Sequence, residues 1–108
     1  MVYRTKKGTD GEALCHLCNE RPGSQMHEII NRNQTHGAAR ELSFTETLCS
    51  WLCATCHERA DTRENEEKLW RRNMETYGVA QVLKDIASVE KALGHKPLLY
   101  LPEDVWQQ

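Results

Sequence analysis

The chain has 108 residues, a formal net charge of −2 and an aromatic content of 6%. A single domain of this size buries limited apolar surface, so a bound metal or disulfides often supplement its core. The acidic balance lacks the basic footprint typical of DNA-binding proteins, and no stretch is apolar enough to span a bilayer. Because residues 1–7 are polar and basic, we expect no secretory signal, no membrane partner and a cytoplasmic location.

The first predicted elements are a leader and a cysteine turn. Residues 1–12 contain two glycines and mixed charges, which favours a flexible leader. The sequence Cys15-His-Leu-Cys18 then predicts a tight turn of the zinc-knuckle type. A C-x2-C pair can place two thiolates on one tetrahedral zinc ion, so this turn is a candidate half of a metal site.

Two short strands and a helix are predicted next. Residues 25–32 and the apolar, β-branched residues within 42–52 suit two strands separated by a polar loop. A helix is expected to begin near Thr55 and to carry His57 and Asp61. These two side chains lie four residues apart and would share one helix face.

Two amphipathic helices are predicted over residues 64–94. Apolar residues recur there near a period of 3.6, with Gly78 interrupting the pattern and Gly94 ending it. We expect this helical hairpin to pack on the preceding core. The tail at 95–108 contains two prolines and several apolar residues, and it is predicted to wrap the surface or to meet a partner.

Four of the five cysteines occur in two C-x2-C pairs. They are Cys15, Cys18, Cys53 and Cys56. An odd total in paired spacing favours a metal over a disulfide framework, and the sequence therefore predicts a structural zinc site. Such a site contributes roughly 10–16 kcal/mol of apparent folding free energy near neutral pH. The fifth cysteine, Cys49, is expected to be a small buried thiol.

The interval between the cysteine pairs encloses a second chemical group. Two strands and a helix would bring together His27, Glu28, His57 and Asp61. Imidazole and carboxylate ligands suit a divalent cation such as Mg, Mn, Ni or Zn, which stabilises charge on a phosphodiester. Glu28 is the candidate base, although strand alternation places it opposite His27 unless a bulge or twist intervenes.

The runs CHLC, MHEIINR and LCATCHERAD, within about residues 13–62, resemble the phage-type HNH nuclease family. That family has a ββα-metal fold and two zinc-binding C-x2-C pairs. The resemblance implies an α+β fold in which a small zinc-stapled ββα-metal core at 13–63 is followed by two helices. It also implies DNA hydrolysis with one catalytic metal.

The resemblance also implies residue roles. His27 and His57 match metal-ligand positions, Asp61 matches a further ligand, and Glu28 matches the general-base position that is usually His. The four paired cysteines match the structural zinc ligands, and Arg32 matches a basic residue of the motif. The candidate nucleic-acid contacts are Arg32, Arg40, Arg59 and Arg63.

Two features of the motif leave alternatives open. The middle Asn of the family, which orients the base, is absent, and Leu48 stands at that position beside Thr47. In an alternative register His27 is the base and Met26 takes the ligand position, where it cannot hold a hard metal.

The leading interpretation is therefore a metal-dependent DNA endonuclease. The alternative is a non-catalytic zinc-ribbon accessory that binds DNA or protein with a degenerate HNH site. A third interpretation is an adaptor whose helices and tail dock on a larger phage protein complex.

Overall fold

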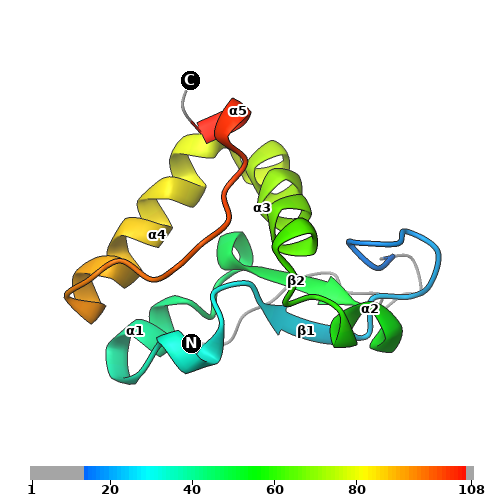
Figure 1. Cartoon of the computed structure of the whole chain (residues 1–108), viewed down its shortest axis with the longest axis horizontal. Coiled ribbons are helices and arrows are strands. Elements are labelled where there is room, and N and C mark those ends of the chain that lie inside the picture. The colour runs from blue at the N-terminus through cyan, green and yellow to red at the C-terminus, as the bar shows by residue number, and fades with distance from the viewer. Residues whose placement is uncertain (1–13, 107–108) are drawn as a thin grey trace.

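The computed structural model describes residues 14–106, so the predicted leader at 1–12 lies outside the described residues. The elements in chain order are β1 (Gln25–Glu28), the 3₁₀ helix η1 (Arg32–Gln34), α1 (Gly37–Leu42), the 3₁₀ helix η2 (Glu46–Leu48), β2 (Cys49–Leu52), α2 (Ala54–Glu58), α3 (Arg63–Tyr77), α4 (Val79–Leu93) and α5 (Glu103–Trp106). Figure 1 shows α3 rising from the side of the strand pair and α4 running back from its far end towards α1. The predicted α+β fold class is confirmed. Between residues 14 and 106, no helix has both the length and the apolar character needed to cross a bilayer.

The sheet consists of β1 and β2 in antiparallel register, with His27 opposite Ser50 and Glu28 opposite Cys49. The cysteine turn docks on the second strand, since the backbone N–H of His16 donates to the carbonyl of Trp51 at 2.9 Å. The backbone N–H of Trp51 donates in return to Nδ1 of His16 at 3.1 Å. Burial, with a smaller effect of Arg72, lowers the pKa of His16 to about 4. His16 is thus a neutral structural acceptor that joins the turn to the sheet.

The helices α3 and α4 follow the predicted apolar period, and specific residues set their ends. The Thr62 side chain accepts a hydrogen bond from the backbone N–H of Asn65 and caps the start of α3. Gly78, with φ of 97°, separates the two helices. Gly94 ends α4 in the left-handed region with φ of 83°, where glycine has no Cβ penalty.

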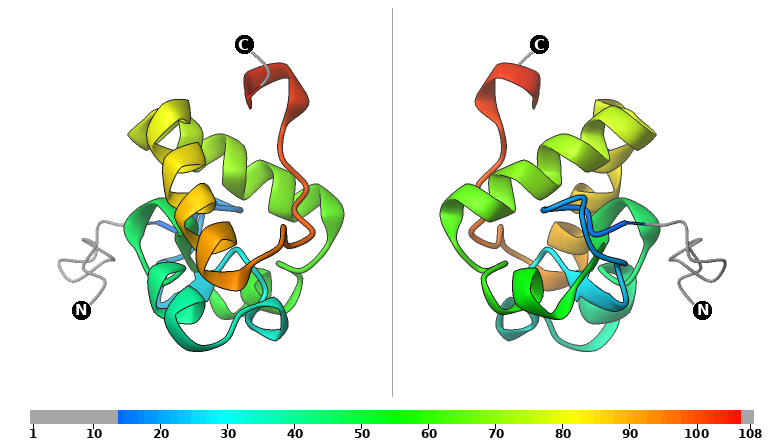
Figure 2. Two further views of the ribbon diagram at one scale, coloured as in Figure 1. Left: turned by 90° about the vertical axis from the view of Figure 1, so that its left-hand side faces the viewer. Right: turned by 90° about the vertical axis from the view of Figure 1, so that its right-hand side faces the viewer.

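One buried cluster joins the cysteine region to the helices. Its members come from the cysteine turn, the sheet, α3 and α4, and they include Cys15, Ile29, Ile30, Leu48, Leu52, Cys53, Leu69, Trp70, Met74, Val82, Ile86 and Val89. The side views in Figure 2 show α4 crossing over the segment that contains α1, and α1 contacts α4. The cysteine turn and the sheet are therefore part of the same hydrophobic core as α3 and α4.

The C-terminal segment returns from the end of α4 towards the corner where α3 meets α4 (Figure 1). The Gln34 side chain brackets the Leu98 backbone, donating to its carbonyl at 3.1 Å and accepting from its N–H at 2.7 Å. The backbone N–H of Tyr100 donates to the Glu66 carboxylate at 2.9 Å. These bonds hold the tail against η1 and α3.

Two local elements differ from the predicted pattern. The polar loop contains the unpredicted helix α1, whose capping residue His36 makes no side-chain cap bond. The helix α2 is shorter than expected and ends at Glu58, with Arg59 as its C-cap. Asp61 consequently lies in the turn after α2 rather than on the same helix as His57.

Candidate functional site

The four paired cysteines converge in space. The Sγ atoms of Cys15, Cys18, Cys53 and Cys56 all lie within 4.8 Å of one another. The Cys18 and Cys53 sulfurs are 3.9 Å apart. Tetrahedral zinc with Zn–S bonds of about 2.3 Å separates its sulfur ligands by about 3.8 Å. The four thiols could therefore hold one metal ion.

The backbone of the cysteine turns favours the thiolate form at two positions. The backbone N–H groups of Glu20 and Arg21 lower the pKa of Cys18. The backbone N–H of Cys56 lowers the pKa of Cys53 to about 6, and the nearby Arg21 guanidinium adds to this effect. Asn19 makes the first turn possible, because it adopts φ of 58°, a conformation that asparagine tolerates.

The thiolate form of Cys56 depends more strongly on a nearby cation than that of Cys18 or Cys53. Burial raises the pKa of Cys56 to about 12, so its thiol is protonated at neutral pH unless a nearby positive charge favours the thiolate. Metal binding at this group would accordingly release protons. The Arg21 Nη1 atom lies 3.8 Å from the Cys53 sulfur and supplies one local positive charge.

A separate cavity of about 670 Å³ contains the second predicted group. It is lined by residues of β1, the loop and η1 after it, the segment after α1, α2, and the turn after α2: Met26, His27, Glu28, Asn31, Arg32, Asn33, Phe44, His57 and Asp61. The fold thus brings His27 and Glu28 into one cavity with His57 and Asp61, about thirty residues further along the chain. Both acidic and basic groups face this space.

The two histidines meet edge to face. Their ring centroids are 5.4 Å apart and the rings are nearly perpendicular, at 88°. Burial lowers the pKa of His27, the Asp61 carboxylate partly opposes that shift, and His57 adds to it. The buried His27 imidazole is therefore neutral at pH 7, which is the form that binds metal ions.

The histidines and Asp61 are less tightly grouped than the cysteines. In the part of the chain that the structure describes, only the four cysteines form a cluster of three or more metal-binding side chains with closely converging ligand atoms. Asp61 is exposed and lines the same cavity. Its carboxylate would have to turn towards the two imidazoles to complete a site with them.

Glu28 lines the same cavity as His27, contrary to the expectation from strand alternation. It is the last residue of β1, and the chain bends directly after it, so the alternation ends there. No bulge is involved, because all four residues of β1 pair with β2 in continuous register. The Glu28 Oε2 atom lies 3.7 Å from Nε of Arg32, whereas its buried Oε1 atom has no hydrogen-bond partner among the described residues.

The predicted nucleic-acid contacts occupy different places. Arg32 lines the cavity beside Glu28. The Arg40 Nη2 atom donates to the carbonyls of Arg32 and Thr35, at 3.1 and 3.0 Å, so this side chain braces the loop. Arg59 is exposed at the end of α2.

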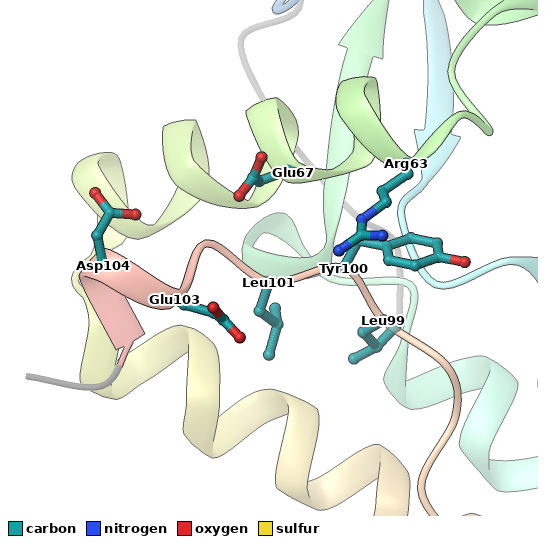
Figure 3. A pocket seen from close by; sticks show the side chains of 7 residues that line it. All are labelled: Arg63, Glu67, Leu99, Tyr100, Leu101, Glu103 and Asp104. Carbon is teal, nitrogen blue, oxygen red and sulfur yellow. The ribbon is translucent and has the colours of Figure 1, made fainter.

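Arg63 belongs to a second cavity, of about 460 Å³, beside the C-terminal tail. Figure 3 shows its guanidinium group against the ring of Tyr100, and its Cζ atom lies 5.3 Å from the ring centroid. Glu67 and Glu103 line the same cavity. Arg32 is therefore the one candidate arginine that lines the cavity with the two histidines.

Comparisons of the chain with protein-family models, with curated proteins and with solved structures found no match. Membership of the HNH family therefore stays a prediction from the motif residues.

Asn31, Asn33 and Phe44 also line the cavity that contains the two histidines, and the sequence did not indicate them as site residues. The Asn31 side chain accepts a hydrogen bond from the backbone N–H of Asn33 at 2.8 Å and caps η1. The sequence Asn-Arg-Asn could have indicated this turn, because asparagine side chains commonly bond the backbone two residues ahead. Phe44 has no comparable local signal, since its position depends on the packing of α1.

Proposed function

We propose that this chain is a metal-dependent DNA endonuclease of the HNH type, which hydrolyses phosphodiester bonds. One observation carries the proposal: His27, Glu28, Arg32, His57 and Asp61 line a single cavity although they are spread over 35 residues of sequence. Two imidazoles, two carboxylates and a guanidinium can supply the metal ligands, the general base and the phosphate contact of a hydrolytic site.

The two metal-binding groups take different tasks in this proposal. The four cysteines hold a structural zinc that stabilises the fold. His27, His57 and Asp61 would hold an exchangeable divalent cation such as Mg, Mn, Ni or Zn. When bound, that cation would supply positive charge that stabilises the phosphate in the transition state.

The remaining residues of the cavity act on the water and the phosphate. Glu28 takes a proton from the attacking water, whose oxygen forms the new bond to phosphorus. The bond from phosphorus to the leaving sugar oxygen breaks, and that oxygen takes a proton from solvent. Arg32 binds the phosphate, since its present ion pair with Glu28 is long and its side chain is 66% exposed.

The test is plasmid nicking by the purified, zinc-loaded protein with added Mg, Mn, Ni or Zn. We expect wild type to nick the plasmid, and both His27→Ala and His57→Ala to lose at least 100-fold in rate. His95→Ala is the matched control, because His95 is exposed and lies outside the cavity. It should retain the wild-type rate.

The alternative proposal is a non-catalytic accessory that binds DNA or a protein partner, such as a larger phage complex. It is favoured by Arg40 and Arg63, whose guanidinium groups already serve internal contacts, and by a cysteine cluster that is complete without the cavity. Binding of DNA by wild type without nicking under any of the four metals would establish the accessory and exclude the enzyme.

A further inference from the structure

Asn73 is a fully buried polar side chain on α3. Its Nδ2 atom donates to two carbonyls, those of Thr47 and Cys49, both at 3.0 Å. Its Oδ1 atom accepts from Nη1 of Arg72 at 3.0 Å. One amide thus joins the helix to the junction between η2 and β2, and it uses both of its N–H groups to do so.

The alternation of carbonyl directions explains why this junction needs an amide. The carbonyl of Leu48 faces β1 and accepts from the backbone N–H of Ile29 at 3.0 Å. The carbonyls of Thr47 and Cys49 accept from the Asn73 amide of α3 instead. The sheet has only two strands within the described residues, so no third strand satisfies these carbonyls. Buried without a partner, each would be strongly destabilising.

The same junction sets the position of Glu28. Cys49 is the register partner of Glu28, and the next residue, Ile29, is bonded to Leu48. The Glu28 side chain itself is held by a single long ion pair with Arg32, and its Oε1 atom has no hydrogen-bond partner within residues 14–106. The backbone of β2 therefore sets the position from which this carboxylate enters the cavity, and the side chain's own contacts add little.

We propose that Asn73 is a positioning residue for Glu28: its amide fixes the start of β2 on the side that faces away from β1, and β2 fixes the strand that carries the Glu28 carboxylate into the cavity. The expected effect on kcat rests on the proposed hydrolysis. The expected effect on the strand rests on the hydrogen bonds alone. Residues 25–32 alone do not fix the position of Glu28, and α3 contributes to it through Asn73.

The central variant is Asn73→Asp, which keeps the shape of the side chain and removes both donors. Val89→Ala is the control, since Val89 is fully buried on α4 and makes none of these bonds. Two quantities are measured on the zinc-loaded proteins: the hydrogen-exchange rate of the Ile29 amide, and kcat and KM for plasmid nicking. Asn73→Ser repeats both measurements without a buried charge if Asn73→Asp does not fold.

We expect the Ile29 amide to exchange at least 10-fold faster in the Asn73 variant than in Val89→Ala. We expect kcat to fall at least 10-fold while KM changes less than 2-fold, because the base is displaced and the DNA surface is unchanged. An unchanged Ile29 exchange rate, or an equal loss of kcat in Val89→Ala, would overturn the positioning role. Absence of nicking by wild type overturns the proposed hydrolysis instead, and the exchange rate still decides whether Asn73 fixes the strand.

Discussion

At the scale of single residues, burial sets the protonation state of His27 and a backbone amide sets that of Cys53. His27 is buried and its pKa is lowered, so its imidazole is neutral at pH 7. Cys53 has its pKa lowered to about 6, chiefly by the Cys56 backbone N–H. Neutral imidazoles and thiolates are the forms that bind cations. The same fold thus sets the protonation states of His27 and Cys53 by different means.

Removal of one thiol should abolish zinc binding and destabilise the fold. We expect Cys53→Ser to lose its zinc and more than about 4 kcal/mol of unfolding free energy, because loss of a structural metal is among the largest single-residue effects. The measurement is zinc content per chain together with urea denaturation. Cys49→Ala is the control and should keep its zinc, since the buried Cys49 thiol donates to the Ser43 carbonyl and stands apart from the cluster. A zinc-free Cys53→Ser protein with wild-type stability would contradict the structural role.

Glu66 should give a measurable pH dependence of stability. Burial raises its pKa above 4.5, although hydrogen bonds from Tyr100 and Trp70 partly oppose the shift. The folded state therefore binds the proton more readily than the unfolded chain does. This contribution to stability is fully present below pH 4.5 and is lost as pH rises through the folded-state pKa.

We expect the stability difference between wild type and Glu66→Gln to shift in favour of wild type as pH falls from 7 towards 4.5. Urea denaturation at several pH values measures this difference. Glu67→Gln, one residue further along α3, should keep the wild-type pH dependence because Glu66 remains. A pH-independent difference between wild type and Glu66→Gln would show that the raised pKa of Glu66 does not affect stability.

At the scale of elements, helix ends are fixed by residues that can adopt the required backbone conformation. Gly94 closes α4 with φ of 83° and donates its backbone N–H to the Glu90 carbonyl at 2.8 Å. A Cβ atom at this position would meet nothing within 4 Å, so a substitution acts through the backbone conformation alone.

We expect Gly94→Ala to lower the unfolding free energy by about 1–2 kcal/mol, the usual cost of a left-handed residue with a Cβ atom. Gly94→Asn should lose less, because asparagine adopts this conformation more readily. Thermal denaturation of the two variants measures the order. Equal stability of Gly94→Ala and wild type would contradict the capping role.

The sequence predicted the long helices well because their apolar period is sustained over two or more turns each. It could not place α1, since the segment Gly37–Leu42 is too short to show a sustained apolar period and its capping residue makes no side-chain bond. The predicted returning strand over 42–52 is reduced to its last four residues, because the preceding part forms η2 and turns. Short elements are set by tertiary packing, which local pattern does not contain.

The candidate site likewise contains residues that the sequence predicts and residues that it does not. Spacing alone was enough to predict the cysteine cluster, because C-x2-C pairs have few other uses in a chain of this kind. The common cavity of His27, Glu28, His57 and Asp61 was expected from the order of strands and helix. The bracing contacts of Arg40 and the stacking of Arg63 on Tyr100 depend on partners 5 to 37 residues away, and composition could not identify them.

At the scale of the whole molecule, the cysteine cluster and the helices share one core. Cys15 and Cys53 belong to the same buried cluster as Trp70 and Val82. Loss of the metal should therefore affect α3 and α4 as well as the turns around it.

We expect a zinc chelator to abolish near-ultraviolet circular dichroism from the tryptophans and most helical signal in one transition. Added zinc should restore both signals, and added magnesium should not. Retention of the helical signal with an unchanged melting temperature after zinc removal would show that the helices fold independently of the cysteine cluster.

We propose that the cysteine cluster holds the fold and that the residues of the histidine cavity hold the chemistry. A metal count per chain under increasing chelator tests it most directly, on wild type and on His57→Ala. We predict that wild type binds one tight zinc and one weak, exchangeable divalent ion, and that His57→Ala loses only the weak one. A wild-type protein that binds the tight zinc and no second ion, or a His57→Ala variant that keeps both, would contradict this division between the two groups.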